Sequence, residues 1–335
     1  MSRPRIALFG GSGFVGTVLA NQLVRADYGV RIFTRDRQHA RALWLLPDTD
    51  VIELEVADEE RVAQALVDCT AAVNLIGILN ERRDNGVDFH RAHVETVEHL
   101  IKACKHARVP HLLHMSALKA GPGAPSHYLR SKGEAEKRLH SASGRQFRST
   151  VLRPSVIFGR HDHFLNRFAA LLKLAPHLLP LTACEARLQP IYVGDVVAAI
   201  LALLRATPSS GSTVVEIGGP ETLTLRAIVD YTAALIARPT TIVPLGGVAA
   251  SLLAWAMEFM PGKPLTRDNL RSLSVASVCA GVNGLVTLGI RPTPLDEIVP
   301  GYVVDGSLRG RYERYRVEAG IARRNGSNGP ATRGD

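Results

Sequence analysis

The sequence has few cysteines, few aromatic residues and no basic-aromatic pattern. Its four cysteines form no C-x-x-C pair, which argues against a zinc knuckle or a disulfide framework and favours a reducing compartment: Cys69, Cys104, Cys184 and Cys279. Aromatic residues make up 5% of the chain and do not alternate with basic ones. Nucleic-acid binding is therefore not expected, despite a formal net charge of +9 to which the C-terminal tail contributes.

No segment has the composition of a signal peptide or a transmembrane helix. The stretch from Ile6 to Val24 is uncharged, but its four glycines together with Asn21 and Gln22 suit a strand and a turn better than a membrane span. The apolar stretch Gly246–Met257 is too short to cross a bilayer, and we expect a buried or pocket-lining helix there. The chain is accordingly expected to be cytoplasmic.

A glycine-rich run directly follows the apolar stretch Ile6–Leu8. The run consists of Phe9, Gly10, Gly11, Ser12, Gly13, Phe14, Val15 and Gly16. It fits both G-x-G-x-x-G and G-x-x-G-x-x-G, so the glycines alone do not choose between nucleotide-binding superfamilies. Glycine lets the backbone approach phosphates, and the N-terminus of a helix predicted at Val15–Ala26 favours an anion. With a second strand at Val30–Thr34, the run predicts a dinucleotide-binding unit in which residues 10–16 contact the cofactor.

Strand-like and helix-like segments alternate through residue 153. The predicted strands are Ile6–Phe9, Val30–Phe33, Val51–Leu54, Ala72–Ile76, His111–Ser116 and Ser149–Arg153. Alternation of this kind predicts an α/β fold, a doubly wound Rossmann sheet of parallel strands with helices on both faces. After Pro154 the pattern becomes leucine-rich and helical, which predicts a smaller, mostly helical substrate region at the C-terminal side.

The domain organisation is therefore expected to be discontinuous in sequence. A Rossmann domain covers residues 1–160, a first substrate-region segment 161–186, a return to the sheet 187–220, the main substrate-binding region 221–318 and a disordered basic tail 319–335. The return segment is assigned to the sheet because Arg187–Leu204 and Thr213–Gly218 have strand and helix character.

Tyr128 and Lys132 lie four residues apart on a predicted helix, so both side chains project from the same face. An ammonium group and a cationic nicotinamide both favour the phenolate, which lowers a phenol pKa of about 10 and allows proton transfer near neutral pH. Ser116, at the end of a predicted strand, could hold the substrate oxygen by a hydrogen bond. Alone, such a pair is most often an ordinary surface tyrosine and lysine. Together with the glycine run and Ser116, in this order, it predicts a catalytic trio.

These motifs occur in the order found in the short-chain dehydrogenase/reductase superfamily, whose extended or atypical branch the chain resembles over nearly its whole length. They are Gly10–Gly16, Asp58, Asn74–Gly77, Ser116, Tyr128 with Lys132, Leu152–Gly159 and Gln189–Val196. The resemblance implies that the cofactor is contacted by further residues beyond the glycine run: Asp58, Leu75, Ile76, Gly77, Tyr128, Lys132, Pro154, Ser155 and Val156.

Within that superfamily the chain resembles the free-standing bacterial relatives of the nucleotide-binding accessory subunit of mitochondrial respiratory complex I. The segments that carry this resemblance are Ser116–Leu118, Tyr128–Glu136, Phe164–Ala169 and Pro264–Asp268. It implies a bound NADP(H) and a link to quinone or respiratory-chain biology, including association with a respiratory complex or with the inner face of the membrane. One position departs from the pattern: many relatives have an asparagine of the proton relay where this chain has His93, which puts such a relay in doubt.

Cofactor preference depends on the end of the second predicted strand. An acidic residue there accepts from the ribose hydroxyls and repels a 2′-phosphate, whereas an arginine binds the phosphate. Arg35 and Arg37, with Thr34 beside them, favour NADP(H). Asp36 would favour NAD(H) if its side chain, rather than that of Arg35, pointed at the ribose.

His161, Asp162 and His163 lack a further ligand at a telling spacing, so we predict no metal site and expect a loop at a pocket rim. Apolar side chains gather in Phe164–Leu181 and Gly246–Met260, after the cofactor strands. Because open α/β sheets bind ligands at their carboxyl edge, we predict an apolar pocket between these two segments and that edge.

The sequence thus predicts an NADP(H)-binding oxidoreductase acting on a carbonyl or alcohol of an apolar, quinone-like or isoprenoid molecule. Tyr128 would be the general acid/base, Lys132 its electrostatic partner and ribose anchor, and Ser116 the donor to the substrate oxygen. Two alternatives stay open: a nucleotide-loaded structural or assembly factor without turnover, and an NAD-dependent epimerase or dehydratase. The trio favours the enzyme, because a scaffold has no chemical need for it.

Overall fold

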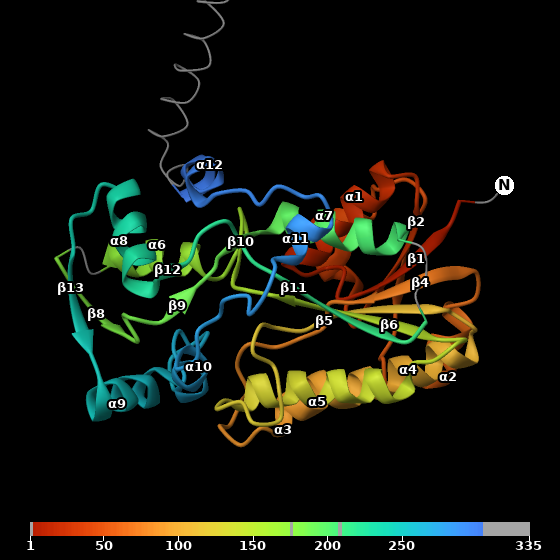
Figure 1. The fold of residues 1–335 in the computed structure, drawn as a ribbon, viewed down its shortest axis with the longest axis horizontal. Helices are drawn as coiled ribbons and strands as arrows, with labels where there is room; N and C mark the ends of the chain where they lie inside the picture. Colours follow the sequence, from red (N-terminus) through yellow and green to blue (C-terminus); the bar gives the residue numbers. More distant parts are fainter. Residues whose placement is uncertain (1–2, 175–176, 207–209, 304–335) are drawn as a thin grey trace, which may run out of the picture.

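The computed structural model describes residues 3–174, 177–206 and 210–303 of the 335-residue chain, so the predicted tail 319–335 and the end of the predicted region 221–318 lie outside it. Seven parallel strands form the central sheet, in the order β11-β6-β5-β4-β1-β2-β3 (Figure 1). Their bounds are β1 (Arg5–Phe9), β2 (Gly29–Thr34), β3 (Thr49–Glu53), β4 (Cys69–Asn74), β5 (His111–Met115), β6 (Arg148–Pro154) and β11 (Ser212–Ile217). All six predicted strands are present, with bounds shifted by a few residues.

Strand β1 lies at the centre of this sheet, between β2 and β4. Leu8 pairs with Ile32 on one side and with Val73 on the other, and all three side chains are fully buried. Strands covered on both faces need apolar side chains in both directions, which explains the continuous apolar runs in the sequence. The parallel order with crossover helices confirms the predicted doubly wound α/β fold.

Helices cover both faces of the sheet (Figure 1). On one face lie α1 (Phe14–Arg25) and α7 (Val193–Arg205), and on the other α2 (Glu59–Ala65), α4 (Thr96–His106) and α5 (His127–Ala142). Each layer has its own buried core, the first around Leu19 and Val196 and the second around Leu100 and Leu139. Shorter pieces join them: the 3₁₀ helix η1 (Arg37–Leu43), α3 (Val87–Phe89) and the π-helix η2 (His90–Glu95).

A second part of the molecule, at the left of Figure 1, has a separate core around Phe158, Leu172 and Ile228. Its strands form small two-stranded sheets: β7 (Ile157–Phe158) with β10 (Ile191–Tyr192), β9 (Arg187–Leu188) with β12 (Leu223–Thr224), and β8 (Leu178–Thr182) with β13 (Thr241–Leu245). Its helices are α6 (Leu165–Leu174), α8 (Leu225–Leu235), α9 (Gly247–Met257), α10 (Arg267–Leu273), α12 (Leu295–Ile298) and α13 (Pro300–Val303).

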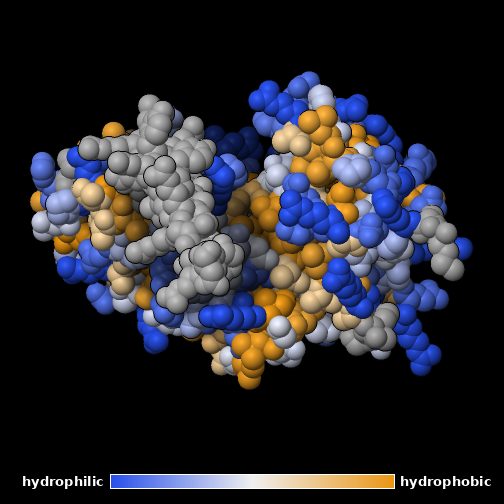
Figure 2. Space-filling model, turned by 90° about the horizontal axis from the view of Figure 1, so that it is seen from above, coloured by the Kyte–Doolittle hydropathy of each residue, from blue (hydrophilic) through white to orange (hydrophobic). Residues whose placement is uncertain are grey.

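The chain returns from this part to the sheet before leaving it again. Helix α7 packs against α1, β11 pairs with β6, and the short α11 (Gly284–Thr287) packs against β11. The exact domain limits stay a prediction. The face in Figure 2 mixes hydrophilic and hydrophobic side chains, and within the described ranges no helix is both long and apolar enough to cross a membrane.

Candidate functional site

The turn between β1 and α1 requires its glycines. Gly10 has a φ of +78°, a conformation that side chains other than glycine rarely adopt. A Cβ on Gly11 would lie 2.7 Å from Cγ2 of Ile32, and a Cβ on Gly16 would lie 2.3 Å from the carbonyl oxygen of Gly10. The absence of these side chains therefore lets α1 begin directly against the carboxyl edge of the sheet.

The N-terminus of α1 suits an anion. Gly13, the N-cap, is extended and provides no side-chain cap, and the first turn carries no acidic residue. The N–H groups of Phe14, Val15 and Gly16 have no partner within the helix by its geometry, and the helix dipole adds positive potential at the same place. These residues fit the pyrophosphate of a dinucleotide, as the sequence predicts.

The charged residues after β2 have different partners. The carboxylate of Asp36 accepts a hydrogen bond from the Gln38 N–H at 2.8 Å and lies 3.0 Å from Nδ1 of His39, so it caps η1. The guanidinium of Arg37 lies over the Trp44 ring, 5.5 Å from its centroid. Arg35 is exposed, and in the described part of the chain its side chain has no hydrogen-bond or ion-pair partner.

The loop after β4 brings the cofactor residues predicted there next to Lys132. Leu75 donates from its N–H to the Phe9 carbonyl at 2.9 Å, and the Ile76 N–H donates to Oδ1 of Asn74 at 3.0 Å. A Cβ on Gly77 would lie 3.2 Å from Nζ of Lys132. A larger residue than glycine would therefore crowd the ammonium group.

Lys132 and Ser116 are both buried, at 4% and 3% exposure. The Lys132 ammonium donates to the Met115 carbonyl at the end of β5, at 2.9 Å. The Ser116 N–H donates to Leu152, whereas its hydroxyl oxygen is buried and has no partner among the described residues. A buried hydroxyl that lacks a partner is costly, so Ser116 is suited to a ligand oxygen.

The Tyr128 ring is held edge-on by two neighbours. Its centroid lies 5.8 Å from that of Phe89 and 5.6 Å from that of His93, both in T-shaped contacts. Burial raises the pKa of Tyr128 to about 12 and lowers the pKa of Lys132 to about 8, with Glu136 acting in the opposite direction on the lysine. The sequence predicted a lowered phenol pKa from a neighbouring ammonium together with a cationic nicotinamide, whereas in the chain alone burial raises the pKa.

His93 lies in the π-helix η2 and links the cofactor loop to α5. Its Nε2 accepts from the Ile78 N–H at 3.2 Å, and its Nδ1 lies 2.8 Å from the hydroxyl of Ser131, which itself donates to the Tyr128 carbonyl. Burial and the charge of Lys132 hold the His93 pKa well below its usual range, so the ring is neutral. Both ring nitrogens are therefore engaged in positioning, which fits the expected departure from an asparagine relay.

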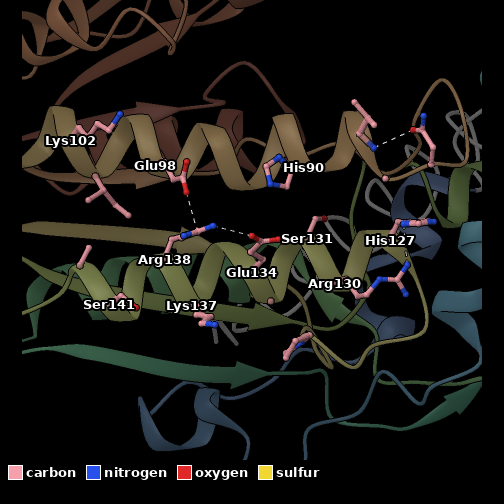
Figure 3. A pocket seen from close by; sticks show the side chains of 17 residues that line it. His90, Glu98, Lys102, His127, Arg130, Ser131, Glu134, Lys137, Arg138 and Ser141 are labelled. Carbon is pink, nitrogen blue, oxygen red and sulfur yellow. Dashed lines mark hydrogen bonds and ion pairs between the residues drawn. The ribbon is translucent and has the colours of Figure 1, made fainter.

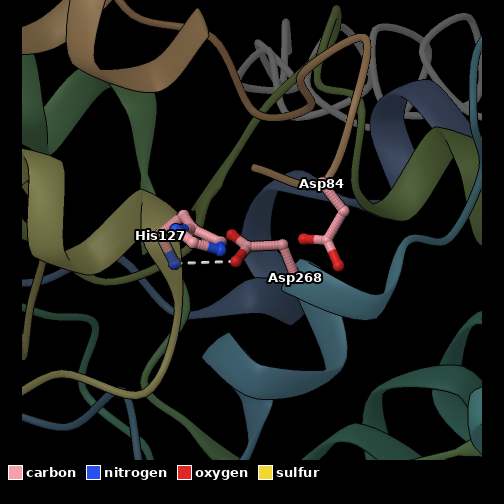
Figure 4. A group of neighbouring side chains, drawn as sticks. All are labelled: Asp84, His127 and Asp268. Carbon is pink, nitrogen blue, oxygen red and sulfur yellow. Dashed lines mark hydrogen bonds between the residues drawn. The ribbon is translucent and has the colours of Figure 1, made fainter. Parts of the chain in front are cut away.

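Asp268, from α10, caps the N-terminus of α5. Its carboxylate accepts from the backbone N–H of His127 at 2.7 Å (Figure 4). It also accepts from the backbone N–H of Tyr128 at 3.1 Å. Arg271 donates to Asp268 at 3.0 Å and also pairs with Asp84. Ligand atoms of Asp84, His127 and Asp268 lie within 4.8 Å of one another. Because guanidinium and N–H groups already occupy these carboxylates, the arrangement fits a helix cap rather than a cation site.

Sequence reasoning did not assign Asp268 a function, although Pro264–Asp268 carried part of the family resemblance. The spacing of Thr266 and Asn269, which form the capping box of α10, marks where that helix begins. Nothing local indicates that its carboxylate reaches α5. His114, on β5, is fully buried, with its Nδ1 3.1 Å from the Asn74 amide.

The remaining predicted cofactor residues lie at the start of α2 and at the end of β6. Asp58 caps α2 by accepting from the Arg61 N–H at 3.2 Å. Pro154 accepts from Leu118, Val156 accepts from Ile191, and the Ser155 hydroxyl donates to the Ser277 carbonyl at 2.8 Å. These contacts place the three residues at the carboxyl end of β6, and their contact with a cofactor stays a prediction.

The predicted pocket is only partly where the sequence placed it. Leu165, Leu172 and Leu181 from the first predicted segment are buried in the core formed with α8, because α6 packs its apolar face there. A cavity of about 570 Å³ is instead bordered by the turn 183–187, the N-terminal half of α9, and α10, with Leu245, Leu270 and Leu273 in its wall. Tyr128 is not among its lining residues.

The helix predicted as buried or pocket-lining at Gly246–Met257 is largely exposed. Only Ala250 and Ala254 of α9 are buried, because small residues face the molecule and large ones face outward. At the predicted rim loop, Asp162 accepts from three backbone N–H groups and from the Tyr302 hydroxyl, while His161 and His163 are exposed.

A larger open groove lies between α4 and α5, with Glu98, Lys102, Glu134 and Lys137 among its lining residues (Figure 3). Arg138, also in its wall, bridges Glu98 at 3.0 Å and Glu134 at 3.2 Å. Neither Tyr128 nor Lys132 lines this groove, so it is not placed to hold a substrate of the trio.

The NAD dependent epimerase/dehydratase family model matches residues 6–218. The chain is 30% identical over 295 residues to mitochondrial NADH dehydrogenase (ubiquinone) 1 alpha subcomplex subunit 9 of Mus musculus, covering 86% of this chain and 77% of that protein. It is 26% identical over 174 residues to the 4-hydroxy-2-methyl-3-oxo-4-farnesyl-3,4-dihydroquinoline-1-oxide ketoreductase of Stigmatella aurantiaca, covering 47% of this chain and 52% of that one.

Among solved structures, MoeE5 in complex with UDP-glucose and NAD superposes with a TM-score of 0.69 over 89% of this chain and 97% of that one, at 17% identity. At that identity the likeness concerns the fold alone. The family match and the mouse relative confirm the resemblance predicted from the motifs.

Proposed function

Because the chain belongs to the NAD dependent epimerase/dehydratase family, we propose that it binds NADP(H) and reduces a carbonyl group of an apolar, quinone-related small molecule. The observation that carries this proposal is the joint burial of Lys132 and the unpartnered Ser116 hydroxyl beside the cofactor loop. Such polar groups are costly to bury unless a ligand forms hydrogen bonds with them.

The choice of NADP(H) is supported by the partners of the residues after β2. Asp36, the residue that would repel a 2′-phosphate, is turned into the cap of η1, and Arg35 is left exposed. An arginine binds a phosphate through charge-assisted, often bidentate, hydrogen bonds. The glycine turn would hold the pyrophosphate, while Gly77 and Lys132 would face the nicotinamide end; when bound, NADPH supplies the hydride.

The proton chemistry belongs to Tyr128. Its phenol is protonated at neutral pH and would donate that proton to a carbonyl oxygen as hydride arrives at the carbon. Because burial in the chain alone raises the Tyr128 pKa to about 12, this donation depends on groups that stabilise the phenolate. The Ser116 hydroxyl would donate a hydrogen bond to the same oxygen. Lys132, held by the Met115 carbonyl, would stabilise the phenolate that remains.

The substrate class is supported by one relative and by the leucines of the cavity next to α10, whose wall also includes Glu185 and Arg187 and does not include Tyr128. Leu245, Leu270 and Leu273 contribute apolar wall to that cavity, and α10 is also the helix that caps α5 at Tyr128. The ketoreductase relative acts, by its name, on a farnesyl-bearing quinoline.

A second function is supported by the mouse relative, which is named as a subunit of NADH dehydrogenase. In that case the chain would hold NADP(H) as a structural ligand and associate with a respiratory complex without turnover. The two functions share the cofactor site and differ in whether Tyr128 transfers a proton.

The experiment that separates them measures NADPH oxidation with a panel of ketones and quinones carrying alkyl or isoprenoid chains. Wild type is compared with Tyr128→Phe, and Tyr231→Phe is the matched control, because its buried hydroxyl has no partner among the described residues. We expect turnover by wild type and Tyr231→Phe only. Turnover that persists in Tyr128→Phe would remove Tyr128 from the mechanism, and tight NADPH binding without turnover on any compound would favour the structural function.

A further inference from the structure

Lys132 carries a buried ammonium group that no carboxylate contacts directly. It donates to the Met115 carbonyl at 2.9 Å, and among the described residues no Asp or Glu lies within ion-pair distance of it. A lone buried ammonium tends to lose its proton, because burial favours the neutral amine. The reaction proposed above needs the charged form beside the phenolate, and the following inference rests on that proposed function. A negative charge held a short distance away would keep the ammonium protonated.

Glu136 supplies such a charge. It follows Lys132 by four residues on α5, so the two side chains project from the same face of the helix about one turn apart. Both residues are buried, with 4% of Lys132 and 8% of Glu136 exposed. Because charges inside a protein are screened much less than charges in water, the carboxylate acts on the ammonium without touching it.

The Glu136 carboxylate is fixed in place by Arg153 of β6. The guanidinium donates through Nε to Oε1 at 2.9 Å and through Nη2 to Oε2, so both carboxylate oxygens are engaged. On the next strand, β11, Glu216 pairs with Arg153 and lies 3.5 Å from its Nη1, and it also accepts from the Ala280 N–H at 2.9 Å. Charges of alternating sign therefore run from Lys132 to the edge strand, and the bidentate pair determines where the Glu136 charge lies.

The other titratable groups around Lys132 are neutral near pH 7. Burial holds the pKa of His93 and the pKa of His114 well below the usual range. Burial also raises the pKa of Tyr128 to about 12. Burial lowers the pKa of Lys132 itself, and Glu136 acts in the opposite direction. Among the described residues, Glu136 is thus the charged group that offsets the burial of this ammonium.

We propose that Glu136 and Arg153 are positioning residues that together set the charge and the place of the Lys132 ammonium. The carboxylate keeps the ammonium protonated. The guanidinium neutralises part of that carboxylate and holds it away from Lys132, so the ammonium remains available to Tyr128. A plain packing clamp between α5 and the sheet would use the same contacts, but it would have no bearing on the proton of Lys132.

The test follows that proton in the nucleotide-free chain, by NMR titration of lysine side chains labelled with ¹³C at Cε. The spectrum of Lys132→Met identifies the Lys132 signal. We expect Glu136→Gln to move the titration midpoint to lower pH by about one unit, because a nearby negative charge is lost. Arg153→Met should move the midpoint to higher pH, because the Glu136 carboxylate is no longer neutralised.

Matched controls come from an ion pair on the same helix. Glu134 and Arg138 lie 3.2 Å apart, with side chains that are 42% and 50% exposed. Glu134→Gln and Arg138→Met change the charge of α5 by the same amounts as the two test variants, but at positions that solvent screens. Both controls should leave the Lys132 midpoint close to that of the wild type.

The direction of the change in Glu136→Gln separates the proposal from a packing clamp. If the pair only held α5 against the sheet, breaking it from either side would let water reach the ammonium, and the midpoint would rise in both variants. A rise or no change in Glu136→Gln would therefore overturn the proposal. The double variant Glu136→Gln/Arg153→Met removes both charges of the pair at once and serves where a single variant does not fold. Its midpoint should also lie below that of the wild type, and a midpoint at or above the wild-type value would count against the proposal.

The titration needs neither nucleotide nor substrate, so its result is independent of the proposed reaction. Midpoints that move as expected in a chain without turnover support the charge assignment and count against the reaction alone. Where NADPH oxidation is observed, its pH profile should move in Glu136→Gln in the same direction as the Lys132 midpoint. A pH profile that stays in place while the midpoint moves would contradict the role of this pair in the reaction.

Discussion

The carboxylate of Asp268 accepts a hydrogen bond from the backbone N–H of Tyr128 at 3.1 Å, although the two residues are 140 positions apart in the chain. The same carboxylate accepts from His127, so α10 of the second part of the molecule caps the helix that carries Tyr128 and Lys132. The position of α5 therefore depends on how the second part of the molecule packs.

Replacing Asp268 by alanine should destabilise the chain and weaken NADP(H) binding together. Loss of a cap that serves two N–H groups costs about 1–3 kcal/mol in the free energy of unfolding. The matched control is Thr224→Ala, which removes the cap of α8. Denaturant unfolding and nucleotide titration of both variants provide the check. An unchanged NADP(H) affinity in Asp268→Ala would show that the cap does not position α5.

Replacing Lys132 by methionine should stabilise the nucleotide-free chain at neutral pH. Burial lowers the folded-state pKa of Lys132 to about 8 from an ordinary value of 10.5, so the unfolded chain binds more protons between these values. The stability of the folded chain therefore rises with pH between about 8 and 10.5. Below pH 8 the cost of burying the charged ammonium is fully present. The expected gain for Lys132→Met is on the order of 1–3 kcal/mol near pH 7, shrinking toward pH 10.5.

The control for that substitution is Lys137→Met, on the exposed side of the same helix. Thermal or urea unfolding across the pH range should show little change for Lys137→Met and a pH-dependent gain for Lys132→Met. A loss of stability in Lys132→Met at every pH would contradict the assigned cost of the buried ammonium.

Two glycines of the first turn should separate folding from nucleotide binding. A Cβ at Gly16 would lie 2.3 Å from the Gly10 oxygen, so Gly16→Ala should lower the free energy of unfolding by about 1–3 kcal/mol or more. A Cβ at the exposed Gly13 has its nearest neighbour at 3.3 Å, so Gly13→Ala should keep stability but weaken dinucleotide binding where the phosphates approach. Equal losses of stability in Gly16→Ala and Gly13→Ala would contradict the assignment of Gly16 to folding and of Gly13 to nucleotide binding.

The sequence predicts well what is encoded locally. Gly10, Gly16 and the apolar strands follow from rules that act over a few residues. Asp268 could not be assigned because its partner residues are distant in sequence. The outward face of α9 was also missed, since a helix that is apolar on every side has no periodicity to show which side is exposed.

The leucines of α6 illustrate the same limit. An apolar helix after the cofactor strands suits a pocket wall and a closed core equally well in sequence. In the structure α6 packs against α8, so Leu172 is fully buried in a core. Which neighbour covers an apolar face is decided by tertiary packing rather than by the segment itself.

The most direct test of the central claim, that this chain holds NADP(H) through its glycine turn and Arg35, is a calorimetric titration with NADPH and with NADH. We predict tighter binding of NADPH, and a selective loss of about tenfold or more for NADPH in Arg35→Ala, because a charge-assisted contact is worth about 1.5–3 kcal/mol. Arg238→Ala, an exposed arginine of the second part of the molecule, should bind like wild type. Tighter binding of NADH, or no binding of either nucleotide, would contradict the account.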